Sequence, residues 1–369
     1  MRHRVVRRAG ARGPGGQDRV APRHAPQEFC VARVVANAAI ARANDVAVTR
    51  RDYQIASADP GIQLSVRQVI AAGISRLAED RIVVFAHGHG ISARPSFDIP
   101  DRNASWAEWM ARRGYAVYLF DFRNCGWSTR ERVMAEPPER NAAPSRSYLA
   151  LRDLGAVVDH VRGRHRVKRV NLVGWSWGGT LAGWYASVQP EKVRRLALYA
   201  PLYSGREEPK AFEPKGAYFL LSATAAAIKE RFAKSQPLPA GEPPRDDSVV
   251  EALAAEERAS DPTSDSRDPP SFRVPAGAVE DLFYTRIGRP LFNASSIYSP
   301  TLVVAGAADS VVPPEHREAL MRDLVHAAVK REVIVPGATH VAQFDPRREE
   351  LFRAVEAFLS ERMQAQPER

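Results

Sequence analysis

The 369-residue sequence predicts an α/β fold: a doubly wound, mostly parallel sheet into which a largely helical segment is inserted. Three observations predict it. Short apolar strands alternate with helical stretches over most of the chain, as a doubly wound sheet requires. Glycine-rich or polar turns follow several of these strands. One interval of roughly a hundred residues interrupts the alternation, which is too long for a simple connection.

The individual elements are predicted from apolar runs and their periodicity. Gln63–Arg67 alternates like an exposed strand of an antiparallel hairpin at the sheet edge. Buried strands are expected near residues 82, 116, 170, 196, 301 and 332. Helical stretches are expected near residues 104–114, 147–163, 178–188, 315–329 and 346–361. No internal repeat is visible.

Composition limits the class of protein. A hydrophobic content of 44% is typical of a globular chain, and no apolar run approaches the eighteen residues that a membrane-spanning helix needs. The seven arginines and single aspartate of residues 1–25 account for +6 of the net charge of +10, so we expect a disordered basic arm there and no nucleic-acid partner. Two cysteines are too few for a disulfide framework and favour a reducing, cytoplasmic location.

Residues 170–181, Val-Asn-Leu-Val-Gly-Trp-Ser-Trp-Gly-Gly-Thr-Leu, read as a strand, a tight GxSxG turn and a helix. A serine in such a turn has a strained backbone, and the turn closes only if the residues two before and two after it are nearly free of side chains. Gly174 and Gly178 meet that demand, so Ser176 is the candidate nucleophile. The alternative is a glycine-rich turn whose serine merely caps the helix.

An acid and a base follow in the chain after two later strands. Leu302–Ala305 leads to Asp309, and Val333–Val335 leads to Pro-Gly-Ala-Thr and His340. Ser176, Asp309 and His340 would therefore meet on loops at one edge of the sheet, in the order serine, aspartate, histidine. Alternatively, Asp309 makes an ordinary turn and His340 is a solvated loop residue.

Two further loops carry a family resemblance. The strand at residues 82–86 precedes His-Gly-His-Gly at 87–90, and the strand at 115–120 precedes Asp-Phe-Arg-Asn-Cys-Gly-Trp-Ser at 121–128. With the serine turn and the order of the three polar residues, these loops resemble the α/β-hydrolase family over residues 46 to 360. By that match, the backbone amides of His89 and Trp177 would form an oxyanion hole.

The resemblance implies a serine hydrolase that cleaves a carboxylic ester through an acyl-serine intermediate. It implies a small-molecule acyl substrate, no cofactor, no metal and no membrane span, and it leaves the oligomeric state open. Carbon–carbon bond hydrolysis and acyl transfer to an alcohol remain alternatives on the same three residues. A binding protein without catalysis on this fold is a further alternative.

The long interval lies where this family inserts its lid. We therefore predict a basic arm (1–25), a first core part (26–202), a lid (203–298) and a second core part (299–369). Within the lid, Tyr218–Lys234 predicts a helix, and the proline-rich stretch after it is expected to be partly mobile. Phe219, Phe283 and Tyr284 are the lid aromatics expected to line the substrate pocket, unless they only form the small core of the lid.

Overall fold

A computed structural model describes residues 46–361, except 75, 102–103, 210 and 214–215. The predicted basic arm (1–25) lies outside the described residues, as does the start of the predicted first core part. In the described part of the chain, no helix is both long and apolar enough to cross a membrane.

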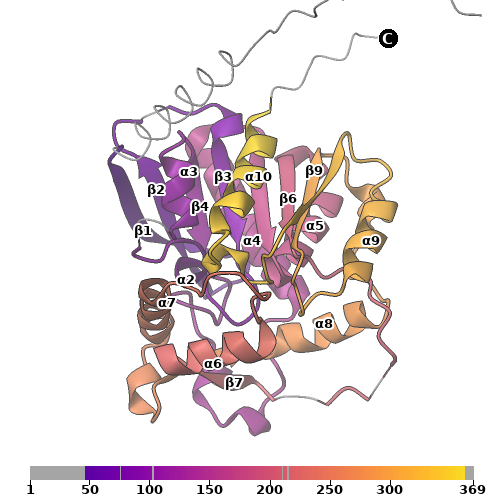
Figure 1. Cartoon of the computed structure of the whole chain (residues 1–369). Coiled ribbons are helices and arrows are strands. Elements are labelled where there is room, and N and C mark those ends of the chain that lie inside the picture. Colours follow the sequence, from indigo (N-terminus) through magenta and orange to yellow (C-terminus); the bar gives the residue numbers. More distant parts are fainter. Residues whose placement is uncertain (1–45, 75, 102–103, 210, 214–215, 362–369) are drawn as a thin grey trace, which may run out of the picture. The chain divides into compact units, whose positions relative to one another are not determined.

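An eight-stranded sheet forms the centre of the described chain, with strand order β1-β2-β4-β3-β5-β6-β9-β10 (Figure 1). Its strands are β1 (Val48–Ala56), β2 (Gln63–Ala71), β3 (Ile82–Ala86), β4 (Ala116–Phe120), β5 (Val170–Trp175), β6 (Val193–Tyr199), β9 (Thr301–Gly306) and β10 (Lys330–Val335). Strands β1 and β2 run antiparallel to their neighbours, and every other pair in the sheet is parallel. The predicted doubly wound, mostly parallel sheet is confirmed.

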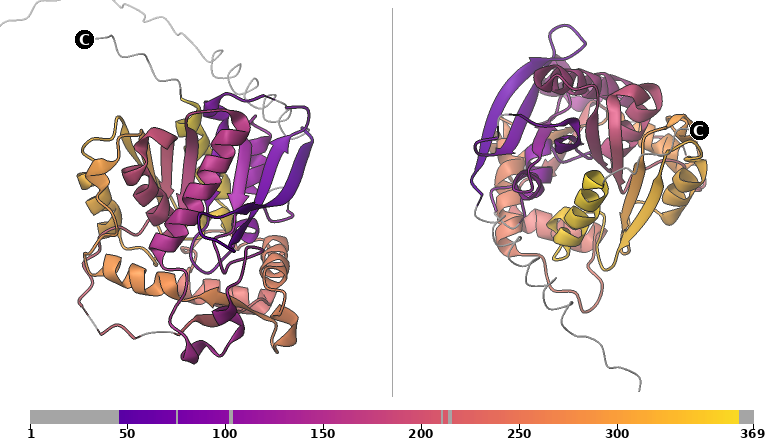
Figure 2. Two further views of the ribbon diagram at one scale, coloured as in Figure 1. Left: turned by 180° about the vertical axis from the view of Figure 1, so that it is seen from behind. Right: turned by 90° about the horizontal axis from the view of Figure 1, so that it is seen from above.

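Helices cover both faces of the sheet (Figures 1 and 2). On one face, α3 (Trp106–Ala111) and α10 (Arg348–Ser360) bury apolar side chains against the strands, together with the short helix α2 (Ala93–Phe97). On the other face lie α4 (Ser147–His165), α5 (Trp177–Val188) and α9 (Pro314–Asp323). Because both faces are covered, the central strands β3, β4 and β5 are buried along their whole length.

Two strand predictions need correction. The segment from Gln63 was expected to be an exposed strand, but β2 is mostly buried because it pairs with β1 on one side and β4 on the other. The strand near residue 332 was expected to be buried, but most of β10 is exposed. It is the edge strand of the sheet and pairs only with β9, so solvent reaches its outer side.

The interval between β6 and β9 contains helices and a small separate sheet. Its helices are α6 (Ala225–Ser235), α7 (Asp247–Ala259) and α8 (Gly277–Arg286). Strands β7 (Tyr218–Ser222) and β8 (Ser271–Pro275) pair in antiparallel fashion and enclose a small apolar cluster of their own. Helices α6 and α8 lie across one end of the large sheet (Figure 1).

The helix predicted from Tyr218 to Lys234 is therefore wrong in its first part. Residues 218–222 form β7, and helix α6 begins only after Thr224, whose side chain accepts a hydrogen bond from the Ala227 amide as a helix cap. The partner strand β8 lies about fifty residues further along the chain, so local periodicity could not reveal the pairing. The proline-rich stretch contains helix α7 and strand β8.

The turn between β5 and α5 brings three backbone segments into contact. A Cβ atom on Gly174 would lie 2.3 Å from the Gly178 carbonyl oxygen, and one on Gly178 would lie 2.2 Å from the carbonyl oxygen of Ala86 at the end of β3. Real Cβ atoms do not come this close to backbone atoms, so both positions require glycine. The end of β3 and the start of α5 thus lie in direct contact.

Gly174→Ala tests this close approach. We expect it to lower the free energy of unfolding by about 1–3 kcal/mol, because the backbone atoms of Gly178 cannot move away without disturbing α5. Gly163→Ala is the matched control, since a Cβ there meets nothing within 4 Å and the residue lies inside helix α4. The control should raise the unfolding free energy by about 0.5–1 kcal/mol. Urea denaturation measures both, and equal effects of the two substitutions would contradict the interpretation.

Candidate active site

The three sequence-predicted polar residues lie in one hydrogen-bonded chain. The Ser176 Oγ is 2.9 Å from His340 Nε2, and His340 Nδ1 is 2.9 Å from Asp309 Oδ2. Each residue follows the carboxyl end of a parallel strand: Ser176 after β5, Asp309 after β9 and His340 after β10. The side chains of all three are buried or nearly so. The sheet therefore brings together residues that are more than 160 positions apart.

Ser176 occupies a backbone conformation that side chains rarely adopt, with φ 54° and ψ −121°. The conformation is held because the Ser176 amide donates to the carbonyl of Tyr199 on β6 and α5 begins at the next residue. The strain turns the hydroxyl away from the helix, and the side chain makes no capping hydrogen bond. The alternative in which Ser176 merely caps α5 does not agree with this geometry.

Asp309 is oriented by its own loop. The backbone amides of Val311 and Val312 donate to its Oδ1 at 2.8 and 2.9 Å, which leaves Oδ2 for His340. An aspartate in an ordinary turn accepts such amides, so the turn itself was predictable from the sequence. The contact of its second oxygen with His340 depends on the pairing of β9 with β10.

The backbone of His340 is held on both sides. Its carbonyl oxygen accepts from Trp175 Nε1 at 2.9 Å and from the Tyr199 hydroxyl at 2.7 Å, while its amide donates to Gln236 Oε1 at 2.9 Å. The Tyr199 hydroxyl also accepts from the Ala342 amide. Burial raises the pKa of Tyr199 well above its ordinary value, so the phenol stays protonated and can donate.

Part of this support comes from the interval between β6 and β9. Ser235, the last residue of α6, accepts a hydrogen bond at its carbonyl from the Ser310 hydroxyl, next to Asp309. Gln236 contacts the His340 amide as described. Arg245 pairs with the buried carboxylate of Asp345 at 2.8 Å, and that carboxylate accepts from the Thr339 amide. The end of α6 and the segment after it therefore hold both loops that carry the acid and the base.

Two backbone amides lie near the serine. Trp177 is the first residue of α5, and the first N–H groups of a helix have no acceptor within it. Among the described residues, the His89 amide also has no hydrogen-bond acceptor. The His89 ring is fixed because its Nε2 donates to the Pro275 carbonyl of β8 at 2.9 Å, and burial lowers its pKa, which keeps the ring neutral. These are the two amides that the sequence predicts as an oxyanion hole.

A cavity of about 280 Å³ opens at Ser176. Apolar side chains from the core and from the interval line much of it, with a smaller set of polar ones. The lining residues are His89, Gly90, Ile91, Trp175, Ser176, Leu202, Leu221, Arg231, Phe232, Ser235, Gln236, Leu282, Arg286, Val311, His340 and Val341. None of the three aromatics predicted for the pocket is among them.

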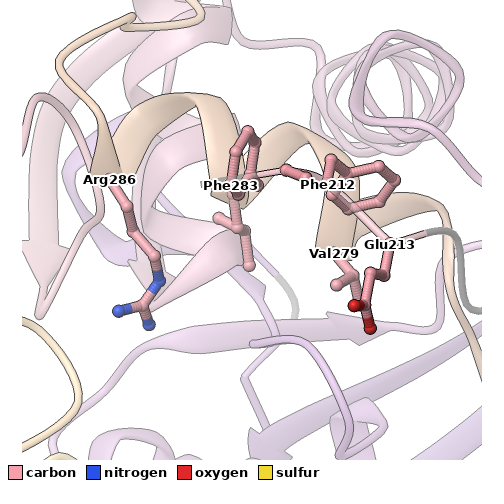
Figure 3. Close-up of a pocket in the computed structure, with 7 residues that line it drawn as sticks. Phe212, Glu213, Val279, Phe283 and Arg286 are labelled. Atoms are coloured by element: carbon pink, nitrogen blue, oxygen red, sulfur yellow. The ribbon is translucent and has the colours of Figure 1, made fainter. Parts of the chain in front are cut away.

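Those aromatics lie nearby instead. The ring of Phe219 is 5.8 Å from that of His89, and Phe219 packs against the small cluster between β7 and β8. Phe283 lines a neighbouring pocket on α8, where its ring contacts that of Phe212 (Figure 3). Its ring also contacts that of Tyr284. The interval places four apolar residues in the cavity at Ser176: Leu202, Leu221, Phe232 and Leu282.

The sequence analysis did not find Tyr199, Gln236, Arg245, Arg231 or Arg286. Tyr199 lies at the end of β6, where a polar group after a buried strand could have drawn attention to it. The other four lie in the interval, where no motif distinguishes them. Among the described residues, no group of three or more histidine, cysteine, aspartate or glutamate side chains could hold a metal ion.

Residues 82–346 match the alpha/beta hydrolase fold family, and the chain belongs to that family. Lipase member M of Mus musculus is 26% identical over 41% of this chain and 36% of its own length. A poly(3-hydroxyalkanoate) polymerase subunit of Haloferax mediterranei is 32% identical over 27% of this chain and 18% of its own length. The matches thus span little more than a third of these curated relatives at most.

Solved structures show the same fold. The enol-lactonase of Burkholderia xenovorans superposes with a TM-score of 0.55 at 16% identity, over 84% of this chain and 100% of that one. A thermophilic esterase of Thermogutta terrifontis gives a TM-score of 0.52 at 18% identity, over 84% and 98% of the two chains. Identity this low supports the fold alone. The family and its lipase and polymerase relatives support hydrolase or acyl-transfer chemistry.

Proposed function

We propose that this protein is a serine hydrolase that cleaves a carboxylic ester through an acyl-serine intermediate. The observation that carries the proposal is the chain of hydrogen bonds from Ser176 through His340 to Asp309, with a strained serine at its head. Ester, amide and lactone bonds all contain the carbonyl carbon that such a serine attacks. An ester or lactone is favoured over an amide because an alcohol is easier to expel than an amine, and an open-chain ester is the proposal.

In the proposed reaction, His340 acts as the general base. Its Nδ1–H donates to Asp309, so Nε2 carries no proton and accepts the Ser176 hydroxyl. When Oγ attacks the carbonyl carbon, Nε2 takes the proton and then gives it to the leaving alcohol. Asp309 holds the ring in this tautomer and stabilises the imidazolium. A water molecule, activated by the same nitrogen, then releases the acid.

The amides of His89 and Trp177 are the proposed oxyanion hole. As the carbonyl carbon becomes tetrahedral, its oxygen gains negative charge, and two fixed N–H donors stabilise it without reorganisation. The glycines on both sides of His89 and the position of Trp177 at the start of α5 suit this role. The Pro275 contact fixes the His89 ring, and thereby its loop, against the interval.

We further propose that residues 203–298 act as a lid that shapes the substrate site. Leu221, Phe232 and Leu282 supply apolar surface to a cavity of about 280 Å³, which suits a small acyl substrate. We also propose that Phe219, Phe283 and Tyr284 affect substrate choice. They would contact parts of a substrate that extend beyond this cavity. The predicted domain limits and cytoplasmic location also remain predictions.

Acyl transfer to an alcohol is the second candidate. The relative named as a poly(3-hydroxyalkanoate) polymerase subunit favours it, although that match covers only 27% of the chain. The same acyl-serine would then react with an alcohol in place of water. Product analysis with an added primary alcohol separates the two, since transfer yields a new ester and hydrolysis yields the free acid. Carbon–carbon bond hydrolysis stays an alternative on the same residues.

Ser176→Ala should abolish hydrolysis of p-nitrophenyl esters and covalent labelling by a fluorophosphonate, because the nucleophile is removed. The fold should survive, since the side chain of Ser176 makes no capping hydrogen bond to α5. Circular dichroism and thermal unfolding check that the variant is folded. Unchanged turnover in a folded variant would refute the role of Ser176.

Asp309→Asn and His340→Ala should each lower kcat by about 10²–10⁴-fold, because the three residues act as one unit. Adding either change to Ser176→Ala should therefore cost nothing further. Steady-state kinetics of the single and double variants measure this. Independent, multiplying effects would mean that the residues do not cooperate.

Tyr199→Phe tests the support of the His340 loop. The change removes a donor to the His340 carbonyl and an acceptor of the Ala342 amide, so kcat should fall about tenfold with little change in KM. Tyr203→Phe is the matched control, since that buried hydroxyl contacts Asp323 and Ala294, away from the cavity. Both variants should lose stability, but only Tyr199→Phe should lose kcat. Equal losses of kcat would show that the effect is a general destabilisation.

A further inference from the structure

The polar lining of the cavity at Ser176 has one sign of charge. Two arginines, Arg231 on α6 and Arg286 at the end of α8, line it, and none of its described lining residues is an aspartate or glutamate. Histidine adds no negative charge. An apolar cavity that carries only cationic side chains favours a ligand with an anionic group, because the low polarity of its surroundings strengthens the attraction.

The two arginines differ in how their charge is balanced. Arg231 donates to both carboxylate oxygens of Glu257, at 2.9 and 3.2 Å, and that glutamate is fully buried. The charges of Arg231 and Glu257 therefore compensate each other within the protein. Arg286 instead pairs with Glu207 at 2.7 Å, where the two side chains are 32% and 47% exposed. Water screens such an exposed pair, so the charge of Arg286 is only weakly compensated at the cavity.

Arg286 lies against the loop that carries Asp309. Its Nη2 contacts the Val311 carbonyl at 3.3 Å, and the amide of Val311 holds Asp309. Val311 and Arg286 both line the cavity at Ser176. In a space of about 280 Å³, a substituent a few bonds from the attacked carbonyl reaches this wall.

Arg286 also belongs to a second, larger pocket. That pocket, of about 620 Å³, is lined mostly by apolar residues such as Phe212 and Phe283, with Glu213 as its one acidic residue among those described, and it shares Leu282 and Arg286 with the cavity at Ser176 (Figure 3). The guanidinium thus stands where the two spaces adjoin. A guanidinium has five N–H donors, and the contacts with Glu207 and Val311 use two of them.

A second donor lies on the same lining. Gln236 is buried and lines the cavity, and its Oε1 is occupied by the His340 amide. Among the described residues, its Nε2 has no hydrogen-bond partner. A buried amide donor without a partner is costly unless a ligand satisfies it. Both features call for a ligand that brings acceptor oxygens beyond the reacting carbonyl.

We propose that the preferred substrate is an ester that also bears a carboxylate, and that Arg286 binds this carboxylate at the junction of the two spaces. The proposal rests on the esterase function proposed above and adds the class of substrate. The planar guanidinium fits a carboxylate through paired N–H donors, which is why arginine serves for such groups. The carboxylate belongs to the acyl part or to the alcohol part of the ester, and the experiment separates the two.

The test compares esters matched in all but one group. For the acyl part, the pair is mono-p-nitrophenyl adipate and p-nitrophenyl hexanoate. For the alcohol part, the pair is 4-carboxyphenyl butyrate and 4-methylphenyl butyrate. In at least one pair, Arg286→Gln should lower kcat/KM for the carboxylate ester about 10- to 100-fold more than it lowers kcat/KM for the neutral ester. The change should appear mainly in KM.

Two controls separate binding from structure and from general charge. Glu207→Gln releases the exposed partner of Arg286, so it should keep or raise the preference for the carboxylate ester. If Glu207→Gln instead lowered the preference for the carboxylate ester as Arg286→Gln does, the role of Arg286 would be only to hold α8 in place. Arg289→Gln removes an equal charge from an exposed residue three positions on, and it should leave the preference unchanged. Equal losses in Arg286→Gln and Arg289→Gln would reduce the effect to long-range charge and overturn the proposal.

Binding without catalysis completes the test. Monomethyl adipate should bind the Ser176→Ala protein by calorimetry at least tenfold more tightly than it binds the Ser176→Ala, Arg286→Gln protein. Equal affinities, together with equal losses for the carboxylate and neutral esters, would overturn the carboxylate site. If the wild-type protein hydrolyses no ester and resists fluorophosphonate, but binding still depends on Arg286, the proposed function fails while the anion site stands.

Discussion

The arrangement of this protein depends on the contact between backbones at the turn that carries Ser176. Gly178 lies so close to the carbonyl oxygens of Ala86 and His87 that no side chain fits between them. That contact joins the end of β3 to the start of α5, so the loop after β3 and the serine face the same space. The proposed oxyanion hole, made of the His89 and Trp177 amides, depends on this contact. The strained backbone of Ser176 is stable because the sheet and helix on either side of it are rigid.

The interval between β6 and β9 contacts the loops that carry the candidate site residues. Ser235 and Gln236, at the end of α6, contact the loops that carry Asp309 and His340, and Pro275 on β8 contacts the ring of His89. Every loop around the candidate site except the serine turn therefore touches the interval. Motion of this segment would alter the orientation of the acid and the base as well as access to the cavity. If the proposed function holds, the same few hydrogen bonds couple substrate selection to the geometry of the candidate triad.

The core and the interval supply different charged groups to the candidate site. The core supplies the candidate triad of Ser176, His340 and Asp309, whereas the interval supplies Arg231 and Arg286 to the cavity wall. The charge of Arg231 is tolerated in the cavity wall because Arg231 pairs with the fully buried Glu257. Arg286 stays closer to solvent, where its charge costs less and remains available to a ligand. This contrast is what distinguishes a structural ion pair from a binding group.

The sequence by itself determined the core of the fold and the three residues of the candidate triad, because these depend on local signals. Fully buried strands are apolar runs, the serine turn needs glycines at fixed offsets, and the acid and the base follow strand ends. The tertiary structure alone decided which residues meet across the interval. Strands β7 and β8 pair across some fifty residues, and Tyr199, Gln236 and Arg286 gain their partners only when distant loops come together. The pocket lining differs from the predicted aromatics for the same reason: side chains on β7, α6 and α8 are oriented by packing, which no local pattern encodes.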